Sequence, residues 1–149
     1  MEDRFEHFSI ALFNISHYWN RIAGEEMKKH DLKGAYALYL ITLYNHPKEE
    51  ITATMLSDLC KRDKADVSRA ITSFQKKGIV EPYGASRYRA PIRLTAEGIE
   101  IARQLKDRAG QVLEAAGQGM DDKMRSHMYQ CLDIIALNLK KICETENSY

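Results

Sequence analysis

The chain has 149 residues, 44% of them hydrophobic and 29% charged, with a formal net charge of +1. This length suits roughly one domain, and ordinary hydrophobicity at near-neutral charge argues against intrinsic disorder. The longest uncharged runs, 7–20 and 34–47, hold 14 residues each, whereas a membrane helix needs about 18 or more apolar residues. The acidic N-terminus lacks the apolar stretch of a signal peptide, so we expect a soluble, cytoplasmic protein with no membrane partner.

Two helices are predicted in the first third of the chain. Apolar residues recur every three or four positions over about 3–29, which indicates one stripe of an amphipathic helix. A more apolar helix is predicted over 35–45. The pair His46-Pro47 ends it, because proline disfavours helical backbone in the residue before it.

Two shorter helices are expected next. Thr52 is the predicted N-cap of a helix over 53–61, in which Leu59 is expected to be buried. Asp63 is the predicted N-cap of the following helix, and Gly78 is expected to end it. The buried stripe of that helix is predicted to consist of Val67, Ala70, Ile71 and Phe74. Its outward face then carries Lys64, Ala65, Ser68, Arg69, Thr72 and Lys76.

A β-hairpin is predicted after these helices. Two short strands, 79–83 and 90–94, are expected on either side of the segment 84–89. Pro82 and Pro91 lie inside them, and proline is tolerated where one edge of a strand stays unpaired. A two-stranded hairpin meets that condition, and its tip is basic.

Two long helices are predicted in the last third of the chain. Thr95 is the expected cap of the first, Gly117 and Gly119 are expected to end it, and the second is predicted over 121–143. Two short helices joined tightly and followed by a hairpin are typical of a winged helix-turn-helix. We therefore predict a mainly α fold with a small β-hairpin, in which the second short helix enters the DNA major groove.

The small net charge conceals a basic segment. Residues 61–93 carry nine Lys or Arg against three Asp or Glu, and the remainder of the chain is net acidic. This segregation favours a binding surface for a polyanion over an ordinary solvated helix face. The sequence contains no nucleophile–base motif, Gly-rich phosphate loop or recognisable pair of catalytic carboxylates, so neither an enzyme nor a cofactor is predicted.

Three short motifs follow one another in and after this segment: Val-Ser-Arg at 67–69, Lys-Gly-Ile-Val-Glu at 77–81 and Leu-Thr-x-x-Gly at 94–98. In their order and spacing they resemble the MarR family of bacterial and archaeal transcription regulators. The predicted helices on both sides also match the family, so the resemblance covers essentially the whole chain.

The resemblance implies a single MarR-like domain over 1–149, with dimerisation helices in 1–32 and 96–149 and a winged helix-turn-helix lobe over 34–95. It also implies a homodimer that binds a pseudo-palindromic operator in double-stranded DNA, and a repressor that is relieved by a small-molecule effector. The apolar stripes of the first and last predicted helices support the dimer independently, because a small monomer needs less apolar surface.

Two features depart from the family's pattern. The family's wing usually carries Asp-x-Arg, whose ion pair stiffens the hairpin. Here Ser86 and Tyr88 take those places, and the arginines stand at Arg87 and Arg89. Lys61 stands in the turn between the short helices, where glycine is common. We expect both wing arginines to contact the DNA backbone or the minor groove.

Arg69 is the strongest candidate for a DNA contact. Its guanidinium can pair with guanine O6 and N7 or clamp a phosphate, and the alternative is a surface ion pair with Asp66. Ser and Thr hydroxyls can donate to phosphates, and an Ala methyl group can contact thymine. The predicted DNA-binding residues are Lys64, Ala65, Ser68, Arg69, Thr72, Arg87 and Arg89.

A ligand cleft is the second feature that the resemblance implies. Many members of the family bind small aromatic acids between the dimerisation helices and the winged helix. Four amphipathic residues are candidates to line such a cleft here: His17, Trp19, Tyr36 and Tyr39. The alternative is that these four are core and hinge residues.

Metal binding and redox sensing fit the sequence less well. None of the five histidines lies three or four residues from another, so no metal site is predicted. Cys60 and Cys131 fall on apolar stripes, where cysteine is usually buried, which leaves Cys143 as the thiol of a redox-sensing alternative. A winged helix for protein–protein contact is the other alternative, and it predicts an apolar second helix rather than the basic one found here.

Overall fold

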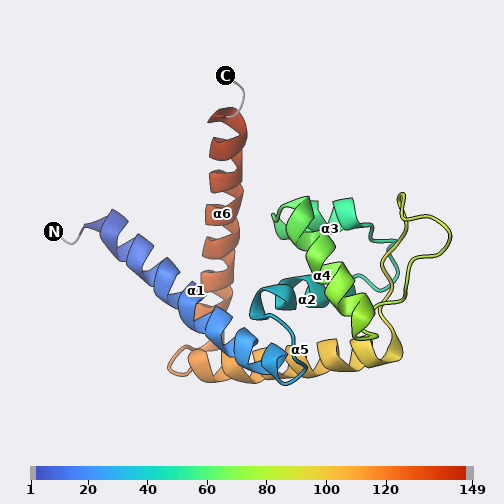
Figure 1. Cartoon of the computed structure of the whole chain (residues 1–149). Coiled ribbons are helices and arrows are strands. Elements are labelled where there is room, and N and C mark those ends of the chain that lie inside the picture. The colour runs from blue at the N-terminus through green and yellow to red at the C-terminus, as the bar shows by residue number, and fades with distance from the viewer. Residues whose placement is uncertain (1–2, 147–149) are drawn as a thin grey trace. The chain divides into compact units, whose positions relative to one another are not determined.

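The computed structural model describes residues 3–146, and in this range it has six α-helices and one short 3-10 helix (Figure 1). It divides into two compact units, and the boundary along the chain falls between Gly110 and Gln111. None of the described helices is long and apolar enough to cross a membrane. The mainly α fold is the one that the sequence predicts.

The first helix, α1 (Arg4–Lys28), begins where the Asp3 carboxylate accepts a hydrogen bond from the backbone N–H of Phe5 at 2.9 Å. The second predicted helix consists of η1 (Gly34–Tyr36) and α2 (Ala37–Asn45), and it ends one residue before His46, as expected. A Cβ atom on Gly34 would lie 2.8 Å from the Cα of Gly24, so η1 can approach α1 this closely only with glycine there.

The two short helices are α3 (Ala53–Cys60) and α4 (Lys64–Lys76). Both predicted N-caps are confirmed: Thr52 Oγ1 accepts from the N–H of Met55 at 3.2 Å, and Asp63 Oδ1 accepts from the N–H of Asp66 at 2.7 Å. Lys61, in the turn, has φ 53°, a left-handed conformation that favours glycine. This explains why lysine is unusual at that position.

The core of the first unit is made by α2, α3, α4, the base of the wing and the first turns of α5 (Ala96–Ala116). The predicted buried stripe of α4 is confirmed, since Val67, Ala70, Ile71 and Phe74 are each at most 3% exposed. The prediction for Leu59 is wrong, because its side chain is 49% exposed. The packed face of α3 consists of Leu56, Ser57 and Cys60, and Leu59 lies beside that face.

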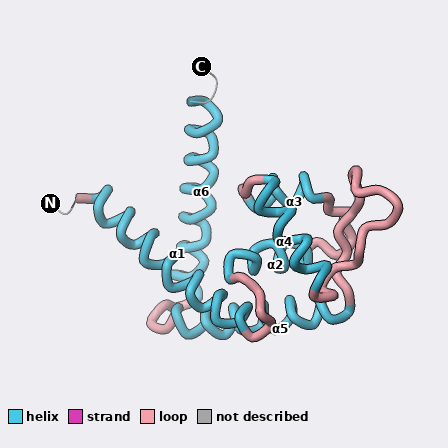
Figure 2. The backbone as a smooth tube through the Cα atoms, viewed as in Figure 1, coloured by secondary structure: helices cyan, strands magenta, loops and turns pink. Residues whose placement is uncertain are grey.

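The predicted strands 79–83 and 90–94 are not formed as such, and Figure 2 draws the wing as loop. The base of the wing is paired only by the bridge between Val80 and Leu94. Proline removes the N–H that would extend a ladder, and the chain has Pro82 and Pro91 there. A second pairing was not predicted from the sequence: the N–H of Ile92 donates to the carbonyl of Ile51 at 2.7 Å, ahead of α3.

The wing returns directly into α5. Thr95 caps this helix as predicted, its Oγ1 accepting from the N–H of Gly98 at 3.1 Å. A Cβ atom on Gly98 would lie only 2.0 Å from the carbonyl oxygen of Ile79. The glycine of the Leu-Thr-x-x-Gly motif is therefore required where α5 packs against the outgoing arm of the wing.

The second unit holds the end of α5 and the last helix, α6 (Asp122–Glu146). Gly119, with φ 95°, lies in the turn between them, and Asp121 Oδ1 caps α6 by accepting from the N–H of Met124 at 2.7 Å. Arg125 pairs with Glu114 at 2.8 Å. None of the residues of α6 is buried.

Candidate nucleic-acid interface and ligand pocket

Helix α4 presents the five residues that the sequence assigned to the DNA major groove. Lys64, Ala65, Ser68, Arg69 and Thr72 are all exposed. The buried stripe on the opposite side holds the helix against the core, so these five side chains share one outward face. Lys64 stands at the N-terminus of the helix, where the helix dipole adds partial positive charge.

Arg69 is held by a carboxylate on its own helix. Its Nη2 lies 3.3 Å from Asp66 Oδ1, and 62% of its side chain is exposed. The other oxygen of Asp66 accepts a hydrogen bond from the hydroxyl of Tyr39. That hydrogen bond, followed by the contact with Arg69, holds the pKa of Asp66 below its usual value, while burial and the neighbouring carboxylate raise the pKa of Tyr39. The sequence interpretation missed the link between Tyr39 and Asp66.

The wing presents Arg87 and Arg89, both exposed. The guanidinium of Arg87 lies 6.0 Å from the ring centre of Tyr83, and that of Arg89 lies 5.2 Å from the ring centre of Tyr88. Neither arginine forms an ion pair within residues 3–146. Ser86, which takes the place of the family's aspartate, accepts from the N–H of Tyr88 at 3.1 Å. A local turn therefore stands where the family has a stiffening ion pair.

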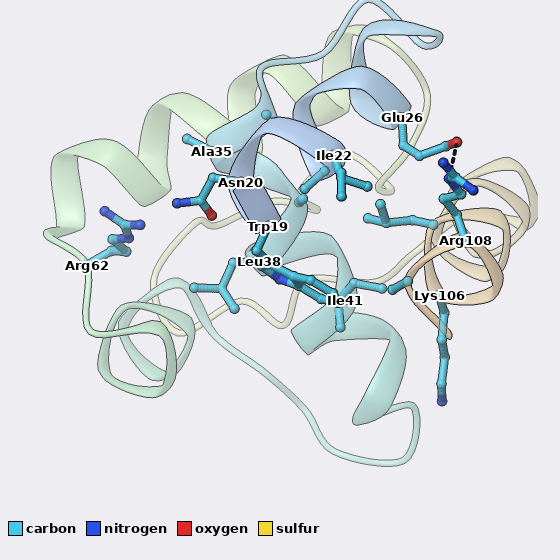
Figure 3. A pocket seen from close by; sticks show the side chains of 15 residues that line it. Trp19, Asn20, Ile22, Glu26, Ala35, Leu38, Ile41, Arg62, Lys106 and Arg108 are labelled. Carbon is cyan, nitrogen blue, oxygen red and sulfur yellow. Dashed lines mark ion pairs between the residues drawn. The ribbon is translucent and has the colours of Figure 1, made fainter. Parts of the chain in front are cut away.

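A pocket of about 470 Å³ lies within the first unit, between α1, η1, α2 and α5 (Figure 3). Its walls are mainly apolar, and in Figure 3 Trp19 lies between Leu38 and Ile41. Four charged residues also line it: Glu26, Arg62, Lys106 and Arg108. Arg108 Nε is 3.8 Å from Glu26 Oε1, which is also 2.7 Å from Lys29 Nζ.

The structure separates the four residues predicted to bind a ligand. Trp19 lines the pocket, whereas His17 is exposed and contacts Tyr18 edge to face at 5.1 Å. Tyr36 and Tyr39 are buried in the core, where Tyr36 meets Phe74 edge to face at 5.9 Å. The alternative interpretation, core residues, describes both tyrosines.

The three cysteines differ in exposure. Cys60 is buried, as expected, and burial raises the pKa of its thiol. Cys131 and Cys143 are both exposed; the expected burial of Cys131 is wrong for the single chain, because nothing in residues 111–146 covers its stripe. No group of three or more His, Cys, Asp or Glu residues in the described part of the chain is placed to hold a metal ion.

Comparisons with known proteins agree with the motifs. Residues 30–87 match the sequence model of the MarR family, and no curated protein sequence matches the chain. A MarR transcriptional regulator from Methanosarcina mazei Go1 has a TM-score of 0.82 at 24% identity, over 94% of this chain and 93% of that one. The Staphylococcus aureus MepR–DNA complex has a TM-score of 0.78 at 19% identity, over 89% of this chain and 97% of that one.

A Listeria monocytogenes protein solved with a 26mer DNA has a TM-score of 0.76 at 18% identity, over 93% of this chain and 90% of that one. At these identities the solved structures show a shared fold. The family match contains both helices of the helix-turn-helix, α3 and α4, and the outgoing arm of the wing. Residues 30–87 therefore match the MarR family in sequence, and the chain shares the fold of solved MarR transcriptional regulators.

Proposed function

We propose that this regulator is a repressor that binds a pseudo-palindromic operator as a homodimer, and that a small aromatic effector relieves the repression. The observation that carries the proposal is the exposed polar face of α4, backed by four buried apolar residues. In a winged helix the second helix of the pair lies in the major groove. An exposed basic face also argues against the alternative, a protein–protein contact module.

The side chains divide into those that read bases and those that hold the backbone. Arg69 is proposed to contact a guanine edge, and Ala65 a thymine methyl group. Lys64, Ser68 and Thr72 are proposed to contact phosphates. Arg87 and Arg89, at the wing, are proposed to hold the backbone or the minor groove.

Exposed apolar side chains on α1 and α6 support the homodimer. Phe5 is 78% exposed, Ile15 is 68% exposed, and Ile134 is 59% exposed. Large apolar surfaces of this kind mark interaction sites in soluble proteins. A second copy of the chain covers them symmetrically, and the resulting two-fold axis matches a palindromic operator.

The pocket supports an effector that combines a ring with an acidic group. An aromatic ring suits the apolar wall at Trp19, and a carboxylate suits Arg108, which lies at the end of the pocket opposite Arg62 (Figure 3). Helix α2 links the pocket to the DNA-binding face, because Leu38 lines the pocket while Tyr39 contacts Asp66 on α4. A ligand that displaces α2 therefore acts on the recognition helix directly.

A binding comparison tests the division between reading and holding, using a duplex selected by the protein from a random-sequence library. Arg69→Ala is expected to cost about 1–3 kcal/mol per half-site on the selected duplex and much less on random DNA. Arg87→Ala and Arg89→Ala are expected to weaken both duplexes alike. All three variants lose one positive charge, so only the local contact differs. Equal weakening of both duplexes by Arg69→Ala would make Arg69 a phosphate contact.

Salt dependence separates DNA binding from the protein-contact alternative. Each subunit offers four basic groups at the proposed interface: Lys64, Arg69, Arg87 and Arg89. A dimer then neutralises on the order of eight phosphates, so the slope of log K against log salt is expected to be about −7. A slope shallower than about −2 would contradict the proposed interface.

Trp19 is the only tryptophan of the chain, so its fluorescence reports on the pocket. Benzoate is a suitable probe because it combines a ring with a carboxylate. Saturable quenching is expected in the wild-type protein and weaker binding in Arg108→Gln. Arg103→Gln is the matched control, since Arg103 lies on the same helix outside the pocket. Identical titrations for the three proteins would exclude this pocket as the carboxylate site.

A further inference from the structure

Asp66 occupies an unexpected place for an acidic residue. It lies in the first turn of α4, on the helix that carries the proposed DNA contacts, and 30% of its side chain is exposed. A carboxylate near DNA phosphates is repelled by them. Because Asp66 by itself weakens DNA binding, we expect it to make a contact through which it favours binding.

Both oxygens of Asp66 are engaged. Oδ2 accepts the hydroxyl of Tyr39, and Oδ1 lies 3.3 Å from Nη2 of Arg69. Tyr39 is 0% exposed and belongs to the core on α2, so its hydroxyl is a fixed point. The carboxylate thus connects a rigid group of the core to an arginine that is otherwise free to move in solvent.

We propose that Asp66 is a positioning residue that fixes the direction of Arg69 for base reading, and that Tyr39 is the anchor of Asp66. This inference rests on the proposed function, in which Arg69 contacts a base. An unanchored surface pair three residues apart orders an arginine weakly. Here the hydrogen bond from Tyr39 leaves Asp66 Oδ1 in one place, so the arginine is ordered before it meets DNA.

The expected gain is one of pre-organisation. Ordering a flexible side chain at an interface costs about 0.5–1.5 kcal/mol, which corresponds to about 2- to 12-fold in affinity. When the ordering is done in the free protein, that factor benefits the sequence that Arg69 can read. Random DNA gains nothing from it and experiences only the negative charge. Asp66 therefore raises the ratio of operator affinity to random-DNA affinity.

Asp66→Asn is the main test. An asparagine can accept from Tyr39 through its oxygen, but its amide nitrogen then faces Arg69 and cannot accept from the guanidinium. We expect the affinity ratio between the selected duplex and random DNA to fall about 2- to 12-fold per half-site, while affinity for random DNA stays equal or rises. Asp58→Asn is the matched control, because it removes an exposed acidic group from α3. It is expected to leave the ratio unchanged.

Tyr39→Phe tests the anchor, since it removes the hydroxyl and keeps the ring in the core. The ratio is expected to fall in the same direction, with Asp66 and Arg69 intact. If this buried substitution prevents folding, Asp66→Asn still decides, because Asp66 lies at the surface. A parallel loss of affinity for both duplexes would indicate a merely structural role for Tyr39 and Asp66 and would overturn the inference.

A double-variant cycle separates this inference from the proposed function. In an Arg69→Ala background, Asp66→Asn is expected to leave the ratio unchanged, because Asp66 acts through Arg69. If Arg69→Ala lowers the ratio but Asp66→Asn does not, or if the two losses add, the positioning role is wrong and base reading by Arg69 stands. If Arg69→Ala itself leaves the ratio unchanged, both the proposed base contact and the positioning role are wrong.

Discussion

Two regions, the core helices α3 and α4 and the last helix α6, carry apolar side chains at similar helical spacings but bury them to different extents. In the first, Leu56, Val67 and Phe74 are each 0% exposed. In the second, on α6, Leu132 is 51% exposed and Ile142 is 53% exposed. An apolar stripe shows that a helix has a face to bury, but the period of 3.6 residues does not tell whether the chain itself or a second copy covers it.

The largest expected effect comes from charging the stripe of α6. Ile135 and Ile142 lie seven residues apart and are 36% and 53% exposed, so the double variant Ile135→Asp/Ile142→Asp changes little within one chain. The proposed dimer buries four isoleucines at these positions. Replacing them with aspartate is expected to raise the dissociation constant on the order of 1,000-fold or more. Sedimentation velocity at micromolar concentration is expected to give a monomer.

Ser126→Asp is the control for that variant, because it adds a negative charge to an exposed position of the same helix nine residues before Ile135, on the opposite face. It is expected to remain a dimer. A double-aspartate variant that also remains a dimer would show that α6 is not the dimer contact, and the exposed stripe of α6 would lose its explanation.

A pair of leucine substitutions sharpens the contrast in stability. Leu56→Ala is expected to lower the free energy of unfolding by about 2–5 kcal/mol at every protein concentration, because it leaves a cavity in the core of one chain. Leu132→Ala is expected to cause a loss of stability that depends on protein concentration, because in the proposed dimer a second copy covers this side chain. Urea unfolding at two protein concentrations tenfold apart measures both losses of stability. If the loss for Leu132→Ala is as independent of protein concentration as the loss for Leu56→Ala, a second copy does not cover Leu132.

The local features of the fold could be predicted from the sequence because they depend on neighbouring residues. Thr52 and Asp63 cap their helices through atoms three residues away. The buried stripe of α4 follows from one helical period. The exposed face of α4 could be assigned for the same reason, since it is the remainder of that helix.

The features that escaped prediction depend on contacts between distant segments. Arg62 and Arg108 line one pocket although 46 positions of sequence separate them, and a lone basic residue resembles a solvated charge until the fold is known. Tyr39 was expected at a ligand cleft because its ring is amphipathic, yet its hydroxyl is satisfied by Asp66 inside the DNA-binding unit. The predicted hairpin allowed for proline at an unpaired strand edge. With both Pro82 and Pro91 present, one bridge, between Val80 and Leu94, pairs the base of the wing.

A pH-dependent effect is expected where the core meets the surface. The hydrogen bond from Tyr39 holds the pKa of Asp66 below its usual value, so the stabilisation is complete above the unfolded pKa of about 3.9 and is lost as the pH falls through the folded pKa. Tyr39→Phe is therefore expected to cost about 1.5 kcal/mol at pH 7 and less at pH 3. Urea unfolding at both pH values measures the difference, and an equal cost at both would show that the carboxylate is not the partner that matters.

The smallest effect, in labelling rates, separates burial by the chain from burial by a second copy. Cys60 is 7% exposed, with its thiol 3.4 Å from Thr42 Oγ1, and burial raises its pKa, so its reactive thiolate is scarce. Cys131 lies within the stripe of α6 and Cys143 near the end of that helix, and both are exposed in the single chain. With iodoacetamide and mass spectrometry, we expect Cys143 to react first, Cys131 more slowly in the dimer, and Cys60 only as the chain unfolds.

Dilution below the dimer dissociation constant gives the decisive comparison among these thiols. The reaction of Cys131 is expected to accelerate to the rate of Cys143, because in the proposed dimer only the second copy protects it, whereas Cys60 stays slow because its own chain buries it. The Ile135→Asp/Ile142→Asp variant is expected to show the diluted pattern at every concentration. Equal rates for Cys131 and Cys143 in the concentrated wild-type protein would mean that the second copy does not cover this part of α6, and the dimer contact would then have to lie on α1.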